Sequence, residues 1–444
     1  MNMGIAKIAR RTFLIGAAAI AGGVAFGYYY TSRPWPNPLK EGLAEGEATF
    51  NPWLKISADD TITVIVPRAE MGQGVQTTLA ALVAEELDVP MERLTVEHGP
   101  GSFAYYNSAM LEDGGPFPFF DESFIAETMR GVSEPLSRTL GLQVTGGSSS
   151  TRDAFDKMRK AGAAARLMLV SAAAAQWKVD AATLTTENGA VVDPASGNRL
   201  AYGALAAAAA SLDAPAEPAL KPKSDWKLLG KSLPRVDMVA KSTGTAQFGV
   251  DVDLPDLLYG TVRMSPRFGA KAKSVNDADA LKVPGVLKVV PIAANTGSGF
   301  GILAQNTWAA FKGAEALEIE WEDAPGFADS AAIFTALREQ LEKPADLTLR
   351  DDGDVTVAFA DAPREEVLEA EYQAPFLAHA CMEPMNATAQ WKDGKLEIWA
   401  PNQGPAILQM VCAPLVGVEA KDVVVNTTFL GGGFGRRAEA DFPV

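Results

Sequence analysis

Hydrophobic and polar positions alternate along the chain in patterns that predict both strands and helices. The β-branched run at residues 61–66 predicts a strand, and apolar residues at helical spacing predict a helix over residues 76–87. A longer, Ala-rich helix is expected over residues 152–177. Three prolines within residues 213–223 indicate a domain boundary after this first region.

The later regions show shorter elements. Strands are expected at residues 258–264, 286–290, around Ile302 and Leu303, and at 367–372, 396–399 and 423–427. A helix is expected over residues 307–317, and residues 297–301, rich in glycine, predict a hairpin turn. The mixture of short strands and helices predicts an α+β (mixed α/β) fold.

The N-terminus is typical of an export signal. Arg10 and Arg11 precede a short apolar run at residues 15–26, as in twin-arginine signals, although an ordinary secretory signal or an uncleaved membrane anchor has similar features. The apolar run is shorter than the ~20 residues of a membrane-spanning helix. Prolines within residues 31–50 indicate a linker to the folded body.

Composition excludes several functional classes. The chain has 444 residues, 48% of them hydrophobic and 21% charged, as expected for a globular protein. Its net charge of -16 would repel a nucleic-acid backbone, so no nucleic-acid partner is expected. Two cysteines cannot by themselves hold an iron–sulfur cluster or an all-thiolate zinc site, and two histidines leave little for a histidine-rich metal centre. A metal would therefore be carried by an organic cofactor.

A glycine-rich loop at residues 431–437 follows the last expected strand. Its three successive glycines leave backbone N–H groups unshielded, and Arg436 and Arg437 add positive charge, which suits a phosphate or a flat cofactor. The spacing matches neither a P-loop nor the dinucleotide fingerprint. A flexible turn with two surface arginines is the structural alternative.

Three further segments have both a structural and a ligand-binding interpretation. Residues 71–74 (Met-Gly-Gln-Gly) form a tight turn before a helix, where Gln73 could contact a ligand. Residues 148–151 cap the long helix and could also bind phosphate. Gln403 lies at the end of an expected strand, where a polar turn residue is the alternative. His98 is expected to be structural.

His379 and Cys381 are candidates for a nucleophile and its base. Two residues apart on an expected strand, they would share a face, but nucleophilic catalysis also requires a third group that orients the base. A structural role is favoured. A cysteine hydrolase remains a distinct alternative, which predicts inactivation by a thiol alkylator.

Together these strings resemble the molybdenum hydroxylases of the xanthine oxidase family, in particular the large subunits of the isoquinoline 1-oxidoreductase and membrane-bound aldehyde dehydrogenase type. The resemblance rests on MGQG (71–74), GGSSST (146–151), HACMEPMNATA (379–389), PNQGP (401–405) and GGGFGRR (431–437). Residues 244–317 also resemble the small α/β hammerhead domain of the family. The implied domains are a signal or anchor at 1–30, a linker at 31–50, molybdopterin-binding regions at 51–225 and 355–444, and the hammerhead domain at 235–325.

The resemblance implies a molybdopterin cofactor, in its cytosine dinucleotide form. Gln403 and Phe434 would lie near the molybdenum. The residues implied to line the pterin and its phosphates are Met71, Gly72, Gln73, Gly74, Ser148, Ser149, Ser150, Thr151, Gly432, Gly433, Gly435, Arg436 and Arg437. The implied reaction hydroxylates an aldehyde or an N-heteroaromatic carbon with oxygen from water.

The implied partners are a small subunit with [2Fe–2S] clusters and a cytochrome c subunit. The implied location is the periplasm, with anchoring to the inner membrane through the N-terminus. The family's catalytic base, a glutamate near the C-terminus, has no counterpart here, and neither Glu383 nor Glu439 matches it. The second molybdopterin-binding region is thus expected to be incomplete and this chain inactive alone, since a missing base costs ~10²–10⁴-fold in rate. The alternative is a membrane-tethered binding or assembly protein that retains the fold without the chemistry.

Overall fold

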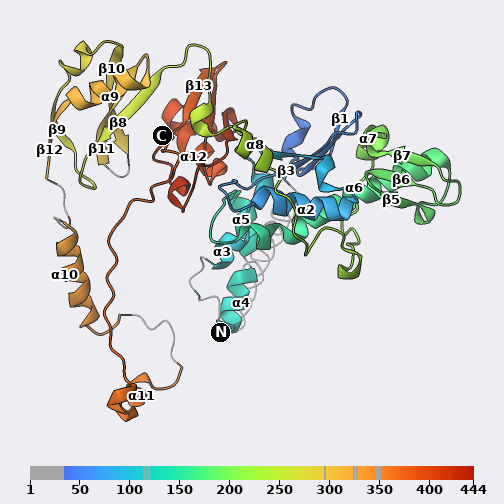
Figure 1. Ribbon diagram of the computed structural model, residues 1–444, viewed down its shortest axis with the longest axis horizontal. Coiled ribbons are helices and arrows are strands. Elements are labelled where there is room, and N and C mark those ends of the chain that lie inside the picture. Colours follow the sequence, from blue (N-terminus) through green and yellow to red (C-terminus); the bar gives the residue numbers. More distant parts are fainter. Residues whose placement is uncertain are drawn as a thin grey trace, which may run out of the picture. The chain divides into compact units, whose positions relative to one another are not determined.

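The computed structural model describes residues 35–113, 117, 121–131, 133–294, 297–323, 326, 329–346 and 352–444. The chain divides into two compact units (Figure 1). The first combines Met1–Val252, as far as it is described, with Ala380–Val444, and the second is Asp253–His379. The expected signal at residues 1–30 lies outside the described residues.

A four-stranded sheet in the order β1-β2-β3-β4 supports the first unit. β1 (Glu47–Asn51), β2 (Leu54–Ser57) and β3 (Ile62–Val66) are antiparallel in turn, whereas β4 (Leu94–His98) runs parallel to β3. Parallel neighbours require a crossover connection, and α2 (Val75–Leu87) provides it. Every residue of β3 is buried, as its β-branched composition predicts.

Two long helices pack against each other beside this sheet (Figure 1). α6 (Ser150–Trp177) lies along α2, and their apolar side chains share one core with β1–β3. Gly162 permits the close approach, because a Cβ atom at this position would lie 2.6 Å from the carbonyl oxygen of Val83. The Ala-rich sequence of α6 is therefore explained by tight helix–helix contact.

Smaller elements complete the N-terminal part of the first unit. They are α3 (Ala109–Asp113), α4 (Phe124–Gly131), α5 (Ser133–Leu140), β5 (Thr185–Glu187), β6 (Ala190–Val192), β7 (Arg199–Ala201), α7 (Tyr202–Ala210) and α8 (Met238–Thr243). β5, β6 and β7 form an antiparallel sheet, and α7 packs on β1. Within the described part of the chain, no helix combines the length and the apolar character needed to cross a membrane.

The C-terminal part of the first unit repeats the same local arrangement. β13 (Thr388–Lys392) is antiparallel to β14 (Lys395–Ala400), and β15 (Val423–Thr427) is parallel to β14. α12 (Pro405–Val416) connects the parallel pair and packs on β15. The loops after β3, β14 and β15 thus all leave the carboxyl ends of strands in parallel pairs, where ligand sites of α/β structures commonly lie.

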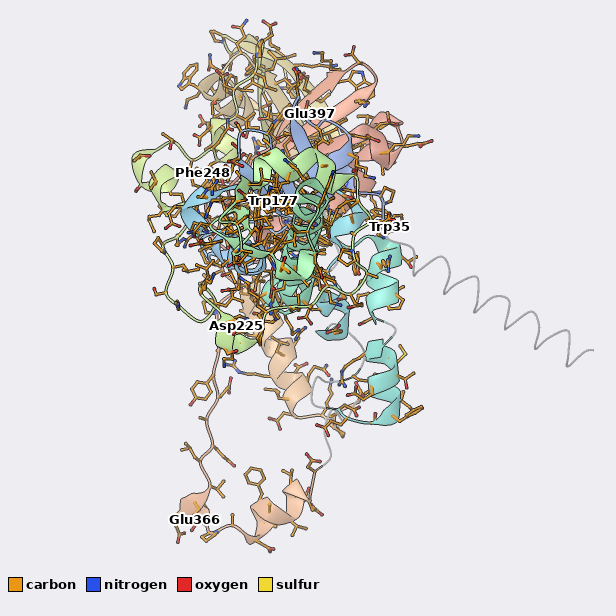
Figure 2. All side chains as sticks on the ribbon, turned by 90° about the vertical axis from the view of Figure 1, so that its right-hand side faces the viewer. Trp35, Trp177, Asp225, Phe248, Glu366 and Glu397 are labelled. Carbon is orange, nitrogen blue, oxygen red and sulfur yellow. The ribbon has the colours of Figure 1, made fainter. Side chains whose placement is uncertain are left out.

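The described residues of the second unit form two small sheets and three α-helices. Its elements are β8 (Tyr259–Met264), β9 (Ala272–Asn276), β10 (Val286–Ala294), β11 (Gly297–Ala304), α9 (Thr307–Ala316), β12 (Glu318–Trp321), α10 (Ser330–Leu341) and α11 (Val355–Asp361). The sheet β10-β11-β8 is antiparallel and is packed against α9, while β9 pairs with β12. Around Glu366 the side chains are exposed (Figure 2).

Most elements expected from the sequence are confirmed, but several expectations are wrong. Residues 367–372 form no strand, because side chains such as Leu368 (90% exposed) and Tyr372 (91% exposed) have no core to cover. Residues 297–301 lie within β11 rather than in a turn, since each pairs with a residue of β10. β1 also begins inside the expected linker at 31–50, because Ala48 and Phe50 are buried. The other domain boundaries stay predictions.

Candidate functional site

Loops from four distant parts of the sequence surround one cavity of about 390 Å³ in the first unit. Two of these loops precede the helices α2 and α6, and the other two follow the strands β14 and β15. The lining residues are Met71, Gln73, Val75, Thr78, Thr145, Gly146, Gly147, Ser148, Ser150, Thr151, Gln403, Phe434 and Gly435. Four of the five sequence strings therefore contribute to the same cavity.

Gln403 and Thr145 connect two of these loops. Gln403 Nε2 donates to the carbonyl oxygen of Thr145 at 2.8 Å, and the backbone N–H of Thr145 donates to the carbonyl oxygen of Gln403 at 2.7 Å. The Thr145 hydroxyl also accepts from the backbone N–H of Ala69 at 2.8 Å, which adds the loop after β3. The cavity wall is therefore held by hydrogen bonds between segments that are distant in sequence.

Gln403 leaves one polar atom for a ligand. Its side chain is 3% exposed, and its Oε1 atom is buried without a hydrogen-bond partner among the described residues. The amide orientation follows from the bond to Thr145, because only the NH₂ group can donate there. A buried carbonyl oxygen without a donor is costly, by about 1–3 kcal/mol, so the arrangement suits a bound group with an N–H or O–H.

The start of α6 presents hydroxyl groups to the cavity. Ser148, Ser150 and Thr151 line it, whereas the Ser149 hydroxyl is fully buried and donates to the carbonyl oxygen of Gly146 at 2.6 Å. Gly147 (φ 56°) and Ser148 (φ 52°) both have left-handed backbone conformations. For a serine this conformation is uncommon, and such strain is concentrated at functional sites.

The Met71–Gly74 loop is internally hydrogen-bonded. Gln73 Oε1 accepts from the backbone N–H of Met71, and Gln73 Nε2 donates to the carbonyl oxygen of Ala69, both at 2.8 Å. The amide that was expected to contact a ligand is thus used to close the turn. Met71 and Gln73 still line the cavity, while Gly72 lies outside its lining and Gly74 lines a neighbouring cavity.

The loop after β15 approaches Met71 and Gln403 closely. A Cβ atom on Gly433 would lie 2.6 Å from Met71 Sδ and 3.3 Å from Gln403 Oε1, so a larger residue here would displace the Met71 side chain. Phe434 follows with φ 53° and is 71% exposed at the cavity lining. Gly432 lies outside the lining.

The two arginines of this loop lie outside the cavity lining. Arg437 is 1% exposed and donates to the carbonyl oxygens of Gly432 and Glu383, both at 2.7 Å. Arg436 pairs with Asp441 through two 2.7 Å hydrogen bonds. The structure thus uses both side chains to hold the loop itself, which differs from the expected direct contact with a phosphate.

The pair His379 and Cys381 gains no support from the structure. No strand is present at these residues, Ala380 between them has φ 48°, and the boundary between the two units follows His379. Cys381 is half-buried with its Sγ 3.6 Å from the carbonyl oxygen of Gly433. Among the described residues, no group of three or more His, Cys, Asp and Glu side chains could hold a metal ion.

His98 lies at the end of β4, beside a separate cavity of about 300 Å³. Its Nδ1 atom lies 2.7 Å from the carbonyl oxygen of Gly99, and its Nε2 atom is buried without a partner among the described residues. Burial, assisted by the nearby charge of Arg68, lowers the pKa of His98 to about 4. The imidazole is therefore neutral at pH 7.

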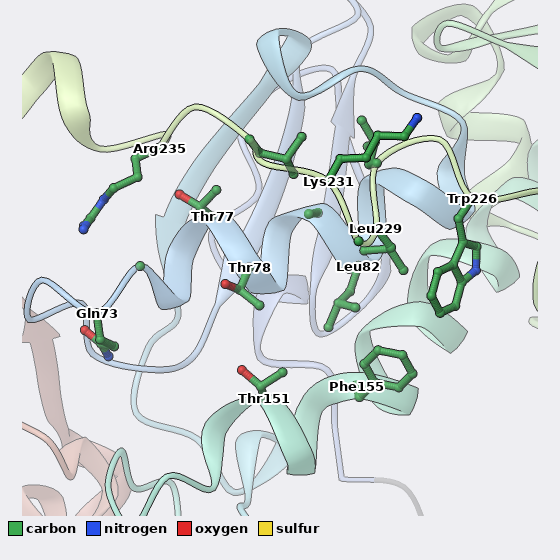
Figure 3. A pocket seen from close by; sticks show the side chains of 15 residues that line it. Gln73, Thr77, Thr78, Leu82, Thr151, Phe155, Trp226, Leu229, Lys231 and Arg235 are labelled. Carbon is green, nitrogen blue, oxygen red and sulfur yellow. The ribbon is translucent and has the colours of Figure 1, made fainter. Parts of the chain in front are cut away.

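A second cavity, of about 440 Å³, adjoins the first through Gln73, Thr78 and Thr151 (Figure 3). Trp226 and Phe155 lie together at one end of it, with their ring centroids 6.5 Å apart, and Arg235 lies toward the other end. Sequence reasoning missed this cavity, as it missed Thr78 and Thr145 at the first one. Thr145 stands next to the GGSSST string, but nothing in the sequence links it to Gln403.

Comparison with known proteins points to one family. Two different models of a molybdopterin cofactor-binding domain match the chain, one at residues 15–109 and the other at residues 339–443. The first match contains the Met71–Gly74 loop and the second contains Gln403 and the loop after β15. These matches, with the relatives below, support a large, molybdopterin-binding subunit of the molybdenum hydroxylase family. The fold is the expected α+β fold.

Curated relatives align with nearly all of this chain. A protein of Gluconacetobacter polyoxogenes named membrane-bound aldehyde dehydrogenase [pyrroloquinoline-quinone] is 31% identical, covering 99% of this chain and 53% of the relative. Isoquinoline 1-oxidoreductase subunit beta of Brevundimonas diminuta is 28% identical, covering 98% and 56%. The chain thus spans about half the length of these relatives. The solved aldehyde oxidoreductase of Desulfovibrio gigas is 20% identical over 47% of this chain and 28% of that one, with a TM-score of 0.37.

Proposed function

We propose that the chain forms the molybdopterin-binding part of an exported molybdenum hydroxylase that oxidises aldehydes or N-heteroaromatic compounds, with oxygen from water. The observation that carries the proposal is the cavity in which Gln403 Oε1 lies buried without a partner beside the hydroxyl-rich start of α6. The names of the relatives support the two substrate classes, because one is an aldehyde dehydrogenase and another an isoquinoline oxidoreductase.

The lining residues fit a molybdopterin. The pterin system carries N–H groups, which suit the Gln403 carbonyl oxygen, and a phosphate, which suits the hydroxyls of Ser150 and Thr151 at a helix N-terminus. Gly433 brings the backbone of the loop after β15 close to Met71 and Gln403 at this cavity. When bound, the cofactor supplies a molybdenum centre that accepts electrons from the substrate and transfers oxygen to it. We propose that Phe434 contacts the substrate, which its exposure at the cavity lining supports.

The cytosine dinucleotide form of the cofactor is part of the proposal. We further propose a small partner subunit with [2Fe–2S] clusters, a cytochrome c subunit as the next electron acceptor, and a periplasmic location reached by twin-arginine export. The relatives named as subunits support an assembly of several chains.

The proposal is tested by cofactor analysis of the full chain made in a host that synthesises molybdopterin. Molybdenum is measured by mass spectrometry, and released CMP is measured after mild acid hydrolysis. We expect equal amounts of both in the wild type and a loss of at least ~10-fold in Gln403→Leu, since one charge-neutral buried hydrogen bond of about 1.5 kcal/mol corresponds to this factor. Gln409→Leu is the matched control, because Gln409 also donates to a backbone carbonyl, that of Val423, but lies outside the cavity.

Three outcomes would overturn the proposal. The wild-type chain could lack molybdenum, which would favour a binding or assembly protein. It could carry pyrroloquinoline quinone, the cofactor in the name of one relative. Finally, Gln403→Leu and Gln409→Leu could retain the cofactor equally, which would exclude this cavity as its site.

A further inference from the structure

Glu70, directly before the Met71–Gly74 loop, is a buried carboxylate at the start of α2. Its side chain is 1% exposed. Oε1 accepts from the backbone N–H groups of Gly72 at 2.8 Å and Gly74 at 3.2 Å, and Oε2 accepts from that of Gln76 at 3.1 Å. One side chain therefore satisfies three amides in and after the loop.

A carboxylate at the N-terminus of a helix is stabilised by the helix itself. The first amides of a helix have no intrahelical acceptor, and they carry the positive end of the helix dipole. Phosphate groups bind at such ends for the same reason. At α2 the chain itself supplies the anion, and a phosphate approaching these amides would meet the Glu70 charge.

Cations from a later segment complete the arrangement. Arg235 Nη2 lies 3.1 Å from Glu70 Oε1, and Arg235 Nη1 donates to the carbonyl oxygen of Gly72 at 2.8 Å. Lys241 lies 3.7 Å from Glu70, and both cations also pair with Asp237. Two carboxylates thus face two cations, so these four side chains contribute no net positive charge to attract a further anion.

The start of α6 is different. The backbone N–H groups of Ser150 and Thr151 have no acceptor among the described residues, and their side chains line the cavity. An independent observation points to a ligand in the same cavity, because Gln403 Oε1 is buried there without a partner. Val75 and Thr77 at the start of α2 likewise have no acceptor among the described residues, but the Glu70 carboxylate accepts from the amides of Gly72, Gly74 and Gln76 beside them. A phosphate would therefore be repelled at α2 and is favoured at α6, where no carboxylate among the described residues accepts from the first amides.

We propose that Glu70 is a positioning residue that takes the place of a bound anion at the N-terminus of α2, fixes the Met71–Gly74 loop, and leaves the N-terminus of α6 to receive the cofactor's phosphate. The last part rests on the proposed function, whereas the role of Glu70 in the loop does not. Arg235 and Lys241 hold the carboxylate in place from the segment that leads to the second unit.

The first experiment measures amide hydrogen exchange in the full chain without cofactor. In Glu70→Ala we expect at least ~10-fold faster exchange at Gly72, Gly74 and Gln76, because their acceptor is removed. Sodium acetate should restore the protection, since its carboxylate can enter the vacated space, whereas sodium chloride at equal ionic strength should not. Such rescue is specific for an anionic occupant and would not follow from a purely structural loss of packing.

Glu70→Asp is the second variant, and it covers the case in which Glu70→Ala does not fold. It retains the charge on a shorter side chain, so intermediate exchange rates are expected. The control is Glu92→Ala, because Glu92 is exposed. Unchanged exchange in the folded Glu70 variants, or equal rescue by chloride and acetate, would overturn the positioning role.

The second experiment measures binding of inorganic pyrophosphate by titration calorimetry. The wild-type chain should bind one pyrophosphate, and Ser150→Ala combined with Thr151→Val should weaken binding at least ~10-fold. Glu70→Ala should gain an additional site that acetate blocks. Binding that is insensitive to the α6 substitutions would overturn the assignment of the phosphate. If the wild type binds no pyrophosphate but acetate rescues Glu70→Ala, the proposed function fails at this site while the role of Glu70 stands.

Discussion

Arg437 and Glu383 form a buried ion pair that joins the loop after β15 to the segment before β13. Arg437 Nη2 lies 3.0 Å from Glu383 Oε2, and the two side chains are 0% and 5% exposed. The other partners of the Glu383 carboxylate are the backbone N–H groups of Gly249, Val250 and Gly431 and the Asn386 side chain. The ion pair therefore stabilises the loop after β15. The sequence instead predicts that Arg437 binds phosphate. Glu383, with its carboxylate engaged in this way, is unsuited to act as a catalytic base.

Removal of one partner from this ion pair should destabilise the first unit. Arg437→Met leaves the Glu383 carboxylate buried without its counter-ion, and we expect the free energy of unfolding to fall by about 3–5 kcal/mol in urea denaturation. Arg436→Met is the matched control, since its pair with Asp441 is more exposed and should contribute at most about 1 kcal/mol. Equal effects of both substitutions would contradict this interpretation.

His98 should make folding stability depend on pH in the acidic range. Its pKa in the folded chain is about 4, below the ordinary value of 6.5, so the unfolded chain binds more protons between these pH values. Stability contributed by neutral His98 is thus complete above pH 6.5 and is lost as the pH falls toward 4. We expect His98→Asn to reduce the difference in unfolding free energy between pH 7 and pH 4.5.

The matched control is His379→Asn, because the sequence contains two histidines and His379 is exposed. This variant should retain the wild-type pH dependence. If the unfolding free energy depended on pH equally in the wild type, His98→Asn and His379→Asn, other groups such as buried carboxylates would account for the loss of stability in acid.

The backbone conformation of Phe434 should lower the free energy of unfolding. Its left-handed backbone, φ 53°, costs a residue with a Cβ atom about 1–2 kcal/mol relative to glycine. Phe434→Gly should therefore be about 1 kcal/mol more stable than Phe434→Ala in denaturant unfolding, although both remove the same ring. If both variants raise the KM for substrate in the assembled enzyme, the ring itself contributes to binding. Equal stability of the two variants would contradict the assignment of backbone strain.

Glu85 should hold the segment that covers the second cavity. Its buried carboxylate accepts from the backbone N–H groups of Lys227, Leu228 and Leu229 at distances of 2.6–3.2 Å. Glu85→Gln replaces one acceptor oxygen by a donor, and we expect a loss of about 1.5–3 kcal/mol in unfolding free energy with faster amide exchange at these three residues. Glu92→Gln, on an exposed side chain, should change neither quantity.

Local pattern predicted the individual elements well. The helices at 76–87 and 152–177 are present as α2 and α6, and the strands at 396–399 and 423–427 as β14 and β15. The prediction failed at residues 367–372, where the apolar residues of the run are mostly exposed and find no partner strand. Periodicity reports how a side chain could be buried, but only neighbouring elements decide whether it is.

The sequence by itself determined the family and the strings that form the cavity, because glycine loops and helix caps are specified by residues adjacent in the chain. Only the tertiary structure decided how those strings act. It joined Gln403 to Thr145, 258 residues away, turned Arg437 toward Glu383, and placed Glu70 at the start of α2. Whether a polar side chain faces a ligand or another part of the protein depends on packing between distant segments, and that information is absent from local spacing.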